Sequence, residues 1–230
     1  TQIQIIEALG GRPPAFAHHS LLTGAEGEGL SKRLGTLSLR DLRAQGVAKE
    51  ALLSLMARLG SSQPVELKLS LDEIAAGFEL GQFGAAPTKF NPDDLWPLTR
   101  ERNQQLPFAA LRDRIDVLGV PADIAEDFWA VASHNITRLE DLEEWWTLCR
   151  DGAEPIVADE DRDFVRQALA MLPPRPFTKA TWGEWTEAVK AATGRKGKTL
   201  FRPLRLALTG RESGPEMADL LPLLQKLPPV

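Results

Sequence analysis

The amino-acid sequence predicts a mainly α-helical protein, with a first part that contains a few short strands and a second part built of helices alone. From about residue 70 onward, apolar residues recur at the 3.6-residue spacing of amphipathic helices. Before that point, short apolar runs are bracketed by Pro and Gly, which is typical of brief strands or extended segments. With 230 residues, 43% of them hydrophobic, the chain is long enough to bury a sizeable core.

The first part of the chain alternates between extended segments and helix. The stretches "PPAFAHHSLL" (13–22) and "GTLSLRDLRAQG" (35–46) predict brief strands or extended segments around a loop. The stretch "KEALLSLMARLG" predicts a helix from Lys49 to Gly60. Prolines at positions 64, 87, 92 and 97 then predict a more irregular connector.

The second part reads as one helix after another. Ile124, Phe128 and Val131 keep a helical period after Pro121, which a first turn accepts. In "TWGEWTEAVKAATG", Thr181 and Glu184 have capping-box spacing and Gly194 supplies a stop. Similar stripes predict helices in "LEDLEEWWTLC", "FVRQALAML", "TLFRPLRLALTG" and "GPEMADLLPLLQKL". Tryptophans on these stripes are predicted to lie mostly in the core, at positions 129, 145, 146, 182 and 185.

Composition excludes several classes of site. The single cysteine, Cys149, excludes an intramolecular disulfide and a cysteine-based zinc cluster, and it is predicted to be a buried apolar residue. His18 and His19 are adjacent and point to opposite faces of an extended segment, so no metal site is expected. There is no run of about 18 apolar residues for a membrane span. We expect a cytoplasmic protein with no membrane partner.

Charge is unevenly distributed, although the formal net charge is only −5. Residues 121–172 contain 4 Lys and Arg against 13 Asp and Glu, whereas residues 173–230 contain 10 against 5. This asymmetry suggests a basic end that faces a polyanion and an acidic end that faces away. The alternative is two solvated surfaces of opposite sign.

The basic end contains a compact group of cations in "GRKGKTLFRPLRLALTGR". Arginine suits bidentate phosphate contacts and stacking on unpaired bases, so this loop, helix and turn form a candidate RNA-binding patch. Arg202 and Arg205 fall on one helix face, but Arg205 lies between two leucines and an internal carboxylate is its alternative partner. The candidate RNA-binding residues are Arg195, Lys196, Lys198, Arg202 and Arg205, with Arg211 beside them.

A second basic feature is the stretch "EGEGLSKRLG" (26–35). A lysine on a glycine-flanked loop can place its ammonium on a triphosphate as negative charge builds on the leaving pyrophosphate. Taken alone, the string is weak evidence for this role, because most such strings are surface turns.

Five segments of the chain resemble the glutamyl-tRNA synthetases, a family of class I aminoacyl-tRNA synthetases, and they follow the family's order. "GLSKRLG" resembles the family's lysine-x-serine-lysine-serine/arginine loop. "LGGRPPAFAHHSLL" and "LRDLRAQGVAKEALLSLMARLG" are similar to the segments on either side of that loop. "FELGQFGAAPTKFNPDDLWPLTRE" resembles the end of the stem-contact region, and "KTLFRPLRLALTGRESGPEMADLLPLL" the last signature of the anticodon-binding body.

The resemblance implies a role for the glycine-flanked loop. Lys32 matches the family's second loop lysine and would contact the phosphates of ATP and act in catalysis. Gly29 stands where the family has its first lysine, which makes a weaker or more adaptable grip on ATP possible. The ATP-binding residues implied in this way are Gly29, Leu30, Ser31, Lys32 and Arg33.

The resemblance also implies how the chain is organised. Residues 1–105 would hold the end of the catalytic domain and the stem-contact region, and residues 106–155 and 156–230 two helical anticodon-binding subdomains. The family's N-terminal nucleotide-binding half has no counterpart here. The chain would be the tRNA-binding portion of a glutamate-tRNA ligase, inactive alone and with no bound cofactor. The parent enzyme would attach glutamate to tRNA(Glu) through glutamyl-adenylate, using ATP with Mg.

Two other classes of function stay open on the sequence alone. One is a free-standing RNA-binding or regulatory paralogue, and the other is a helical protein-interaction module whose acidic middle is its working surface. No motif indicates whether the parent also charges tRNA(Gln), or which residues read the anticodon.

Overall fold

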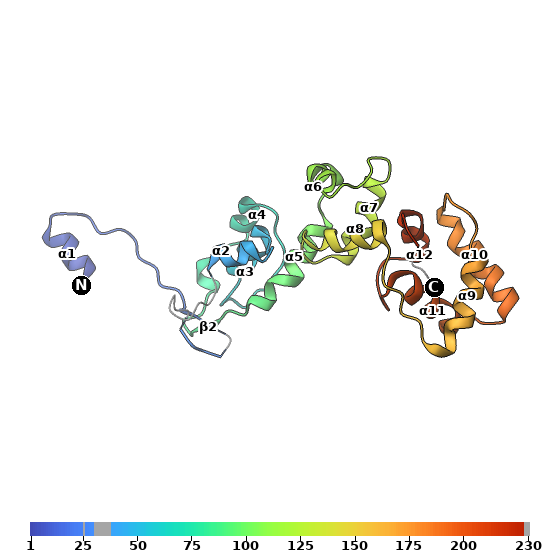
Figure 1. The fold of residues 1–230 in the computed structure, drawn as a ribbon. Helices are drawn as coiled ribbons and strands as arrows, with labels where there is room; N and C mark the ends of the chain where they lie inside the picture. The colour runs from blue at the N-terminus through green and yellow to red at the C-terminus, as the bar shows by residue number, and fades with distance from the viewer. Residues whose placement is uncertain (25, 30–37, 228–230) are drawn as a thin grey trace. The chain divides into compact units, whose positions relative to one another are not determined.

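The structure is a computed structural model that describes residues 1–24, 26–29 and 38–227, and it is mainly α-helical, as predicted (Figure 1). The chain forms two compact units, residues 1–98 and 99–230. The α-helices are α1 (Gln2–Ala8), α2 (Leu39–Ala44), α3 (Lys49–Met56), α4 (Leu71–Ala76), α5 (Leu95–Gln104), α6 (Arg112–Val117), α7 (Ala125–Ala132), α8 (Asp141–Asp151), α9 (Arg162–Ala170), α10 (Lys179–Thr193), α11 (Lys198–Thr209) and α12 (Met217–Leu220). Single 3₁₀ turns are η2 (Leu80–Gln82), η3 (Pro92–Asp94), η4 (Phe108–Ala110), η5 (Ser133–Asn135), η6 (Asp159–Asp161) and η7 (Leu221–Leu223).

The first unit contains a small parallel sheet. Its strands are β1 (Leu22–Thr23) and β2 (Thr88–Lys89), with Leu22 opposite Thr88. Beside the sheet, the hydroxyl groups of Ser20 and Thr88 are hydrogen-bonded at 2.8 Å. The sheet joins segments that are 65 residues apart in the sequence. The small core of this unit consists of Leu42, Ala51, Leu55, Phe90, Leu95 and Leu98.

The strand expectation for "GTLSLRDLRAQG" is wrong where the structure describes this stretch. Residues 39–44 form α2, because Ser38 and Asp41 make a capping box. The Ser38 hydroxyl oxygen accepts the Asp41 N–H at 3.1 Å, and the Asp41 carboxylate accepts the Ser38 hydroxyl at 2.7 Å. This local capping of the first helical turn outweighs the alternating apolar pattern. In "PPAFAHHSLL", regular strand pairing begins only at the last residue, Leu22.

The second unit is organised around one hydrophobic cluster that runs from Leu111 to Leu224. The tryptophans behave as the periodicity predicted, since four of the five on the helical stripes are at most 6% exposed and Trp182 packs against their cluster. The indole N–H groups of Trp129, Trp145 and Trp185 donate to backbone carbonyl groups, and that of Trp185 reaches the Ala168 carbonyl at 2.8 Å. The predicted boundaries near residues 105 and 152–158 stay predictions.

Local details of the helices in this unit differ from the sequence-based expectation. The helix expected from Pro121 begins at Ala125. The capping box of α10 is formed by Thr178 and Thr181, so that Thr181 lies inside the first turn and does not cap it with Glu184. Gly194 ends α10 in the left-handed region at φ 70°, as predicted. The last expected helix is shorter than "GPEMADLLPLLQKL", because α12 ends at Leu220 and η7 continues through Pro222.

Candidate nucleic-acid interface

A cavity of about 620 Å³ opens in the second unit between α7, the start of α10 and the segment that follows α11. Three separate parts of the chain supply its walls, so that it exists only in the folded unit. The lining residues are Asp127, Ala130, Val131, His134, Asn135, Phe177, Thr178, Lys179, Gly214, Pro215, Glu216, Asp219, Pro222 and Leu223.

The cavity is acidic and rich in hydrogen-bond acceptors. Three carboxylates line it, of which Asp219 pairs with the Lys179 ammonium at 2.9 Å. This hydrogen bond, together with the charges of Asp219 and Asp127, raises the pKa of Lys179. Three carboxylates and one ammonium group leave the cavity with a net negative charge, which disfavours a phosphate. The cavity favours a ligand whose edge donates hydrogen bonds.

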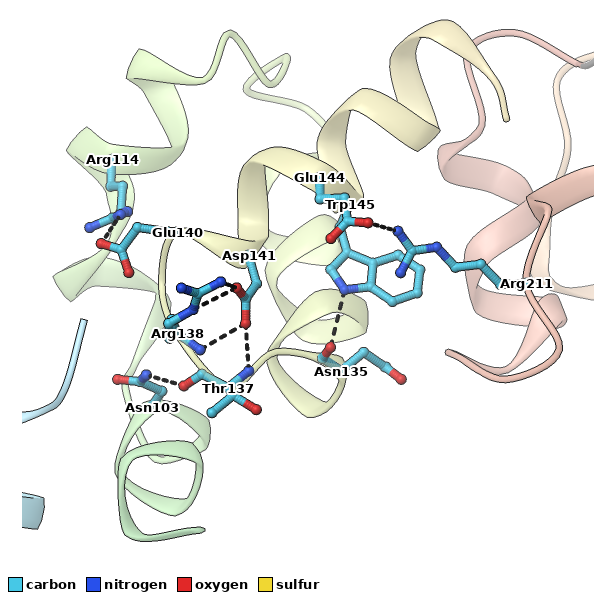
Figure 2. Close-up of polar contacts among 10 residues, drawn as sticks. All are labelled: Asn103, Arg114, Asn135, Thr137, Arg138, Glu140, Asp141, Glu144, Trp145 and Arg211. Carbon is cyan, nitrogen blue, oxygen red and sulfur yellow. Dashed lines mark hydrogen bonds and ion pairs between the residues drawn. The ribbon is translucent and has the colours of Figure 1, made fainter. Parts of the chain in front are cut away.

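The segment between α7 and α8, residues 133–140, contributes His134 and Asn135 to the cavity lining, and we call it the wall loop. Figure 2 shows the polar contacts that hold it. Asp141, the first residue of α8, accepts the N–H groups of Thr137 and Arg138 on the same carboxylate oxygen, both at 2.9 Å. From the other side, Asn103 of α5 donates its Nδ2 to the Thr137 carbonyl at 2.8 Å. The middle of the wall loop is therefore fixed by two buried or partly buried side chains.

The cavity-facing end of the wall loop is tied as well. Trp145 of α8 donates its indole N–H to the Asn135 carbonyl at 3.1 Å (Figure 2). The Asn135 side chain donates its Nδ2 to the Val131 carbonyl at 3.0 Å, which satisfies a carbonyl group in the last turn of α7. Asn135 is thus tied to both α7 and α8.

The charge of Asp141 is stabilised by these contacts. Burial raises the pKa of its carboxyl group, but the N–H groups of Arg138 and Thr137 and the Arg138 guanidinium lower it by more, and the net result is a lowered pKa. The Arg138 guanidinium lies 3.1 Å from the second carboxylate oxygen. Asp141 therefore remains ionised at neutral pH and accepts hydrogen bonds on both of its oxygens.

The opposite wall is the segment after α11, residues 210–216. Arg211 pairs with Glu144, and its guanidinium carbon lies 4.5 Å from the centre of the Trp145 ring (Figure 2). Arg205 of α11 donates to the Pro215 carbonyl at 2.9 Å. Gly214, which lies between Arg211 and Pro215 in the sequence, has φ 150°, and a Cβ at this position would lie 3.0 Å from the Trp145 side chain. The segment is thus clamped between α8 and α11.

Three of the cations predicted to bind RNA come together at a second, shallower cavity of about 330 Å³. It is lined by Lys198, Phe201, Arg202, Arg205 and Glu212, all in or next to α11. Arg202 pairs with Glu212, and this hydrogen bond and charge hold the pKa of Glu212 below its usual value. Phe201 is 43% exposed, so that cations and an accessible aromatic ring share one surface.

The remaining predicted cations lie elsewhere. Arg195 pairs with Asp161 and lies over the Phe164 ring at 4.0 Å, which joins the end of α10 to α9. Lys196 is exposed. In the part of the chain that the structure describes, no carboxylate forms an ion pair with Arg205, whose guanidinium has a pKa lowered by burial. The acidic middle therefore neutralises part of the basic end, through Arg195 and Arg211.

The residues of the glycine-flanked loop lie mostly outside the described residues. This applies to Leu30, Ser31, Lys32 and Arg33. Gly29 is described, and it forms an antiparallel bridge with Thr23 of β1.

Sequence reasoning missed the larger cavity. Its polar residues stand at element ends in three segments, and no spacing connects Asn135 with Glu216. The only signal is the polar turn "SHN" between two apolar stripes.

Over residues 1–24, 26–29 and 38–227, no group of three or more His, Cys, Asp or Glu side chains is arranged to hold a metal ion. No helix in these same ranges combines the length and the apolar character that crossing a bilayer requires. Cys149 is buried, and burial raises the pKa of its thiol to about 12.

Comparisons with known proteins match both parts of the chain. The family described as the anticodon binding domain matches residues 108–227. The family described as the catalytic domain of class I tRNA synthetases (E and Q) matches residues 1–97. The larger cavity and the cation-lined one therefore both lie within the match to the anticodon binding domain.

Individual relatives agree with these matches. Glutamate--tRNA ligase 1 of Paracoccus denitrificans (strain Pd 1222) is 69% identical over 98% of this chain and 51% of its own length. Glutamate--tRNA ligase 1 of Cereibacter sphaeroides (strain ATCC 17025) is 67% identical over the same shares. The solved glutamate-tRNA synthetase of Elizabethkingia anophelis has the same fold, with a TM-score of 0.74 at 22% identity over 96% of this chain and 50% of that one. The chain spans about half the length of the curated relatives it matches. It belongs to the family of the anticodon binding domain, and its residues 1–97 match part of the catalytic domain of class I tRNA synthetases (E and Q).

Proposed function

We propose that this chain is the tRNA-binding portion of a glutamate-tRNA ligase, and that its second unit binds the anticodon loop of tRNA(Glu). The observation that carries the proposal is the acidic cavity of about 620 Å³ inside the match to the anticodon binding domain. Single-stranded loops are recognised when unpaired bases splay out and hydrogen-bond through their edges. The cavity has room for such a base and the groups to read it.

The chemistry of the cavity selects a base edge that donates hydrogen bonds. The carboxylates of Asp127 and Glu216 can accept amino or imino protons, as carboxylates do from the cytosine N4 amino group. Asn135 adds an amide at the same cavity. Phe177 and Pro215 supply apolar surface for the face of the base.

The backbone phosphates would lie on the cations at the start of α11. Lys198, Arg202 and Arg205 line one cavity beside the exposed Phe201 ring, which can stack on a neighbouring base. Lys196 is exposed close by in sequence and would add a further phosphate contact. Arg195, the remaining predicted contact, would act mainly by holding the α10 end to α9, since Asp161 and Phe164 already occupy its guanidinium.

In the whole ligase, the glycine-flanked loop would contact ATP. Lys32 would place its ammonium on the ATP phosphates, with Gly29, Leu30, Ser31 and Arg33 around it. The whole enzyme would join glutamate to tRNA(Glu) through glutamyl-adenylate in the cytoplasm, using ATP with Mg. This portion alone would bind RNA and neither ATP nor glutamate, because one loop cannot orient all the reactants.

The anticodon proposal is tested by binding of a fluorescent hairpin that carries the anticodon stem and loop of tRNA(Glu). We expect the 230-residue chain to bind it, with a Kd that rises with salt and rises again when the anticodon bases are changed. A helical protein-interaction module would show neither dependence, and that result would overturn the proposal.

The loop proposal is tested in a full-length ligase. Lys32→Ala should slow glutamate-dependent exchange of pyrophosphate into ATP, whereas Lys49→Ala should not, because Lys49 is 82% exposed on α3. An unchanged exchange rate in the Lys32 variant would contradict the assignment.

A further inference from the structure

We infer that Asp141 is a positioning residue for anticodon discrimination, together with Asn103, because these two side chains fix the wall loop against which a base would be read. The inference rests on the proposed function. Asp141 lies outside the set of residues that line the cavity, so its effect would be exerted through the backbone of residues 134–138.

Three hydrogen bonds from side chains meet at the centre of the wall loop. One oxygen of Asp141 accepts two consecutive backbone N–H groups at 2.9 Å, and Asn103 binds the carbonyl of the same residue, Thr137, from α5 (Figure 2). The backbone N–H and the backbone carbonyl group of Thr137 are thereby both fixed, the first by a side chain of α8 and the second by a side chain of α5. Asn103 is 2% exposed, so that its bond to Thr137 cannot be replaced easily by water.

A short segment of backbone connects these hydrogen bonds to the cavity. Thr137 is two residues from Asn135, which lines the cavity together with His134. Ile136 between them is 1% exposed and packs in the core, so that displacement of Thr137 is transmitted along a short, fixed segment. Asn135 is also held by Trp145, but only through its own carbonyl.

The position of the wall loop affects how well a base can be read. Hydrogen bonds to a base edge depend on the position of the reading group, and a supporting shell that is loose by about 1 Å is enough to lose selectivity. Removing the Asp141 carboxylate leaves the partly buried N–H of Thr137 and the exposed N–H of Arg138 without their acceptor, and the cost at Thr137 drives the wall loop to rearrange. Loss of discrimination between bases is the expected result, with phosphate binding at α11 left in place.

The test measures a ratio. The 230-residue chain is titrated into two fluorescent hairpins, one with the anticodon stem and loop of tRNA(Glu) and one with the same loop made abasic at the anticodon. The Kd for the abasic hairpin divided by the Kd for the intact hairpin reports base reading. A general loss of folded protein or of charge changes both Kd values alike and leaves this ratio unchanged.

Three variants and one control give the decision. Asp141→Ala should lower the ratio about tenfold, and Asn103→Ala should lower it in the same direction. Asp141→Asn should retain most of the wild-type Kd ratio, since an asparagine amide oxygen can still accept the N–H groups of Thr137 and Arg138. The control is Asp151→Ala, at the other end of α8, where the carboxylate pairs only with the adjacent exposed Arg150 at 2.6 Å among the described residues. Its ratio should equal that of the wild type.

Each outcome is decisive. Near-ultraviolet circular dichroism first establishes that a variant is folded, and if Asp141→Ala is not, Asp141→Asn and Asn103→Ala carry the test. An unchanged ratio in a folded Asp141→Ala or Asn103→Ala variant overturns the inference while the proposed function stands. An equal fall in Asp151→Ala also overturns it. A wild-type chain that does not distinguish the two hairpins overturns the proposed function itself.

Discussion

The guanidinium group of Arg211 lies over the indole ring of Trp145, with its central carbon 4.5 Å from the ring centre. Arg211 follows the end of α11, and Trp145 is in the middle of α8. The same guanidinium pairs with Glu144, so that one side chain connects the wall of the cavity after α11 to the helix that supports the opposite wall.

Replacing Arg211 should loosen this connection. Arg211→Ala should lower the free energy of unfolding by about 1 kcal/mol through the loss of the cation-π contact. Arg211→Lys should recover only part of that loss, because an ammonium does not stack on the indole as a planar guanidinium does. Urea unfolding followed by tryptophan fluorescence checks both. Arg150→Ala, which removes only an exposed pair, is the matched control and should change the unfolding free energy by less than about 0.5 kcal/mol.

Two glycines of the second unit should respond to alanine with opposite signs. Gly214→Ala should destabilise the protein by about 1–3 kcal/mol, since its φ is 150° and the new Cβ would lie 3.0 Å from the Trp145 ring. Gly183→Ala should stabilise it by about 0.5–1 kcal/mol, because Gly183 lies inside α10 and its Cβ would have no heavy atom within 4 Å. Thermal unfolding of the pair gives the comparison. Equal shifts would contradict this account of Gly214.

The lowered pKa of Asp141 makes part of the stability depend on pH. The pKa of Asp141 in the folded protein lies below the unfolded value of about 3.9. Between these two pKa values, the carboxyl group binds a proton more readily in the unfolded chain than in the folded one. The contribution of Asp141 is therefore complete above about pH 5 and is lost as the pH falls through the folded pKa. The difference in unfolding free energy between wild type and Asp141→Asn should shrink from neutral pH towards about pH 3. A difference in unfolding free energy that stays constant over this pH range would contradict the assigned role of the Asp141 charge.

The cations and the aromatic ring at α11 should contribute to RNA binding in distinguishable ways. Lys198→Ala should weaken binding of the anticodon hairpin and reduce the slope of log Kd against log salt by about one, as expected for a phosphate contact. Phe201→Ala should weaken it by about 1–3 kcal/mol with the slope unchanged, as expected for base stacking. Fluorescence anisotropy over a range of salt concentrations measures both. Identical salt slopes in the two variants would argue against this division of roles.

The sequence by itself determined the helical architecture and most of the core. Apolar periodicity is a local property, and burial of each stripe requires only that some partner helix be present, so the positions of Trp145, Trp185 and Cys149 in the core followed directly. The stop at Gly194 also followed, because the left-handed conformation there is a property of one residue. Local rules failed where two of them competed, as at Ser38 and Asp41, whose capping box made a helix of a stretch with a strand-like pattern.

The sequence also indicated which residues around α11 could meet RNA, and there the tertiary structure decided how their charge is used. Arg195 and Arg211 find carboxylates 34 and 67 residues away along the chain, and no spacing in the sequence connects these pairs. The acidic cavity was decided by the structure alone, since its walls come from α7, α10 and the segment after α11. Electrostatic and hydrogen-bonding partners act over a few ångströms in space whatever their separation in sequence, so only packing of the whole unit brings them together.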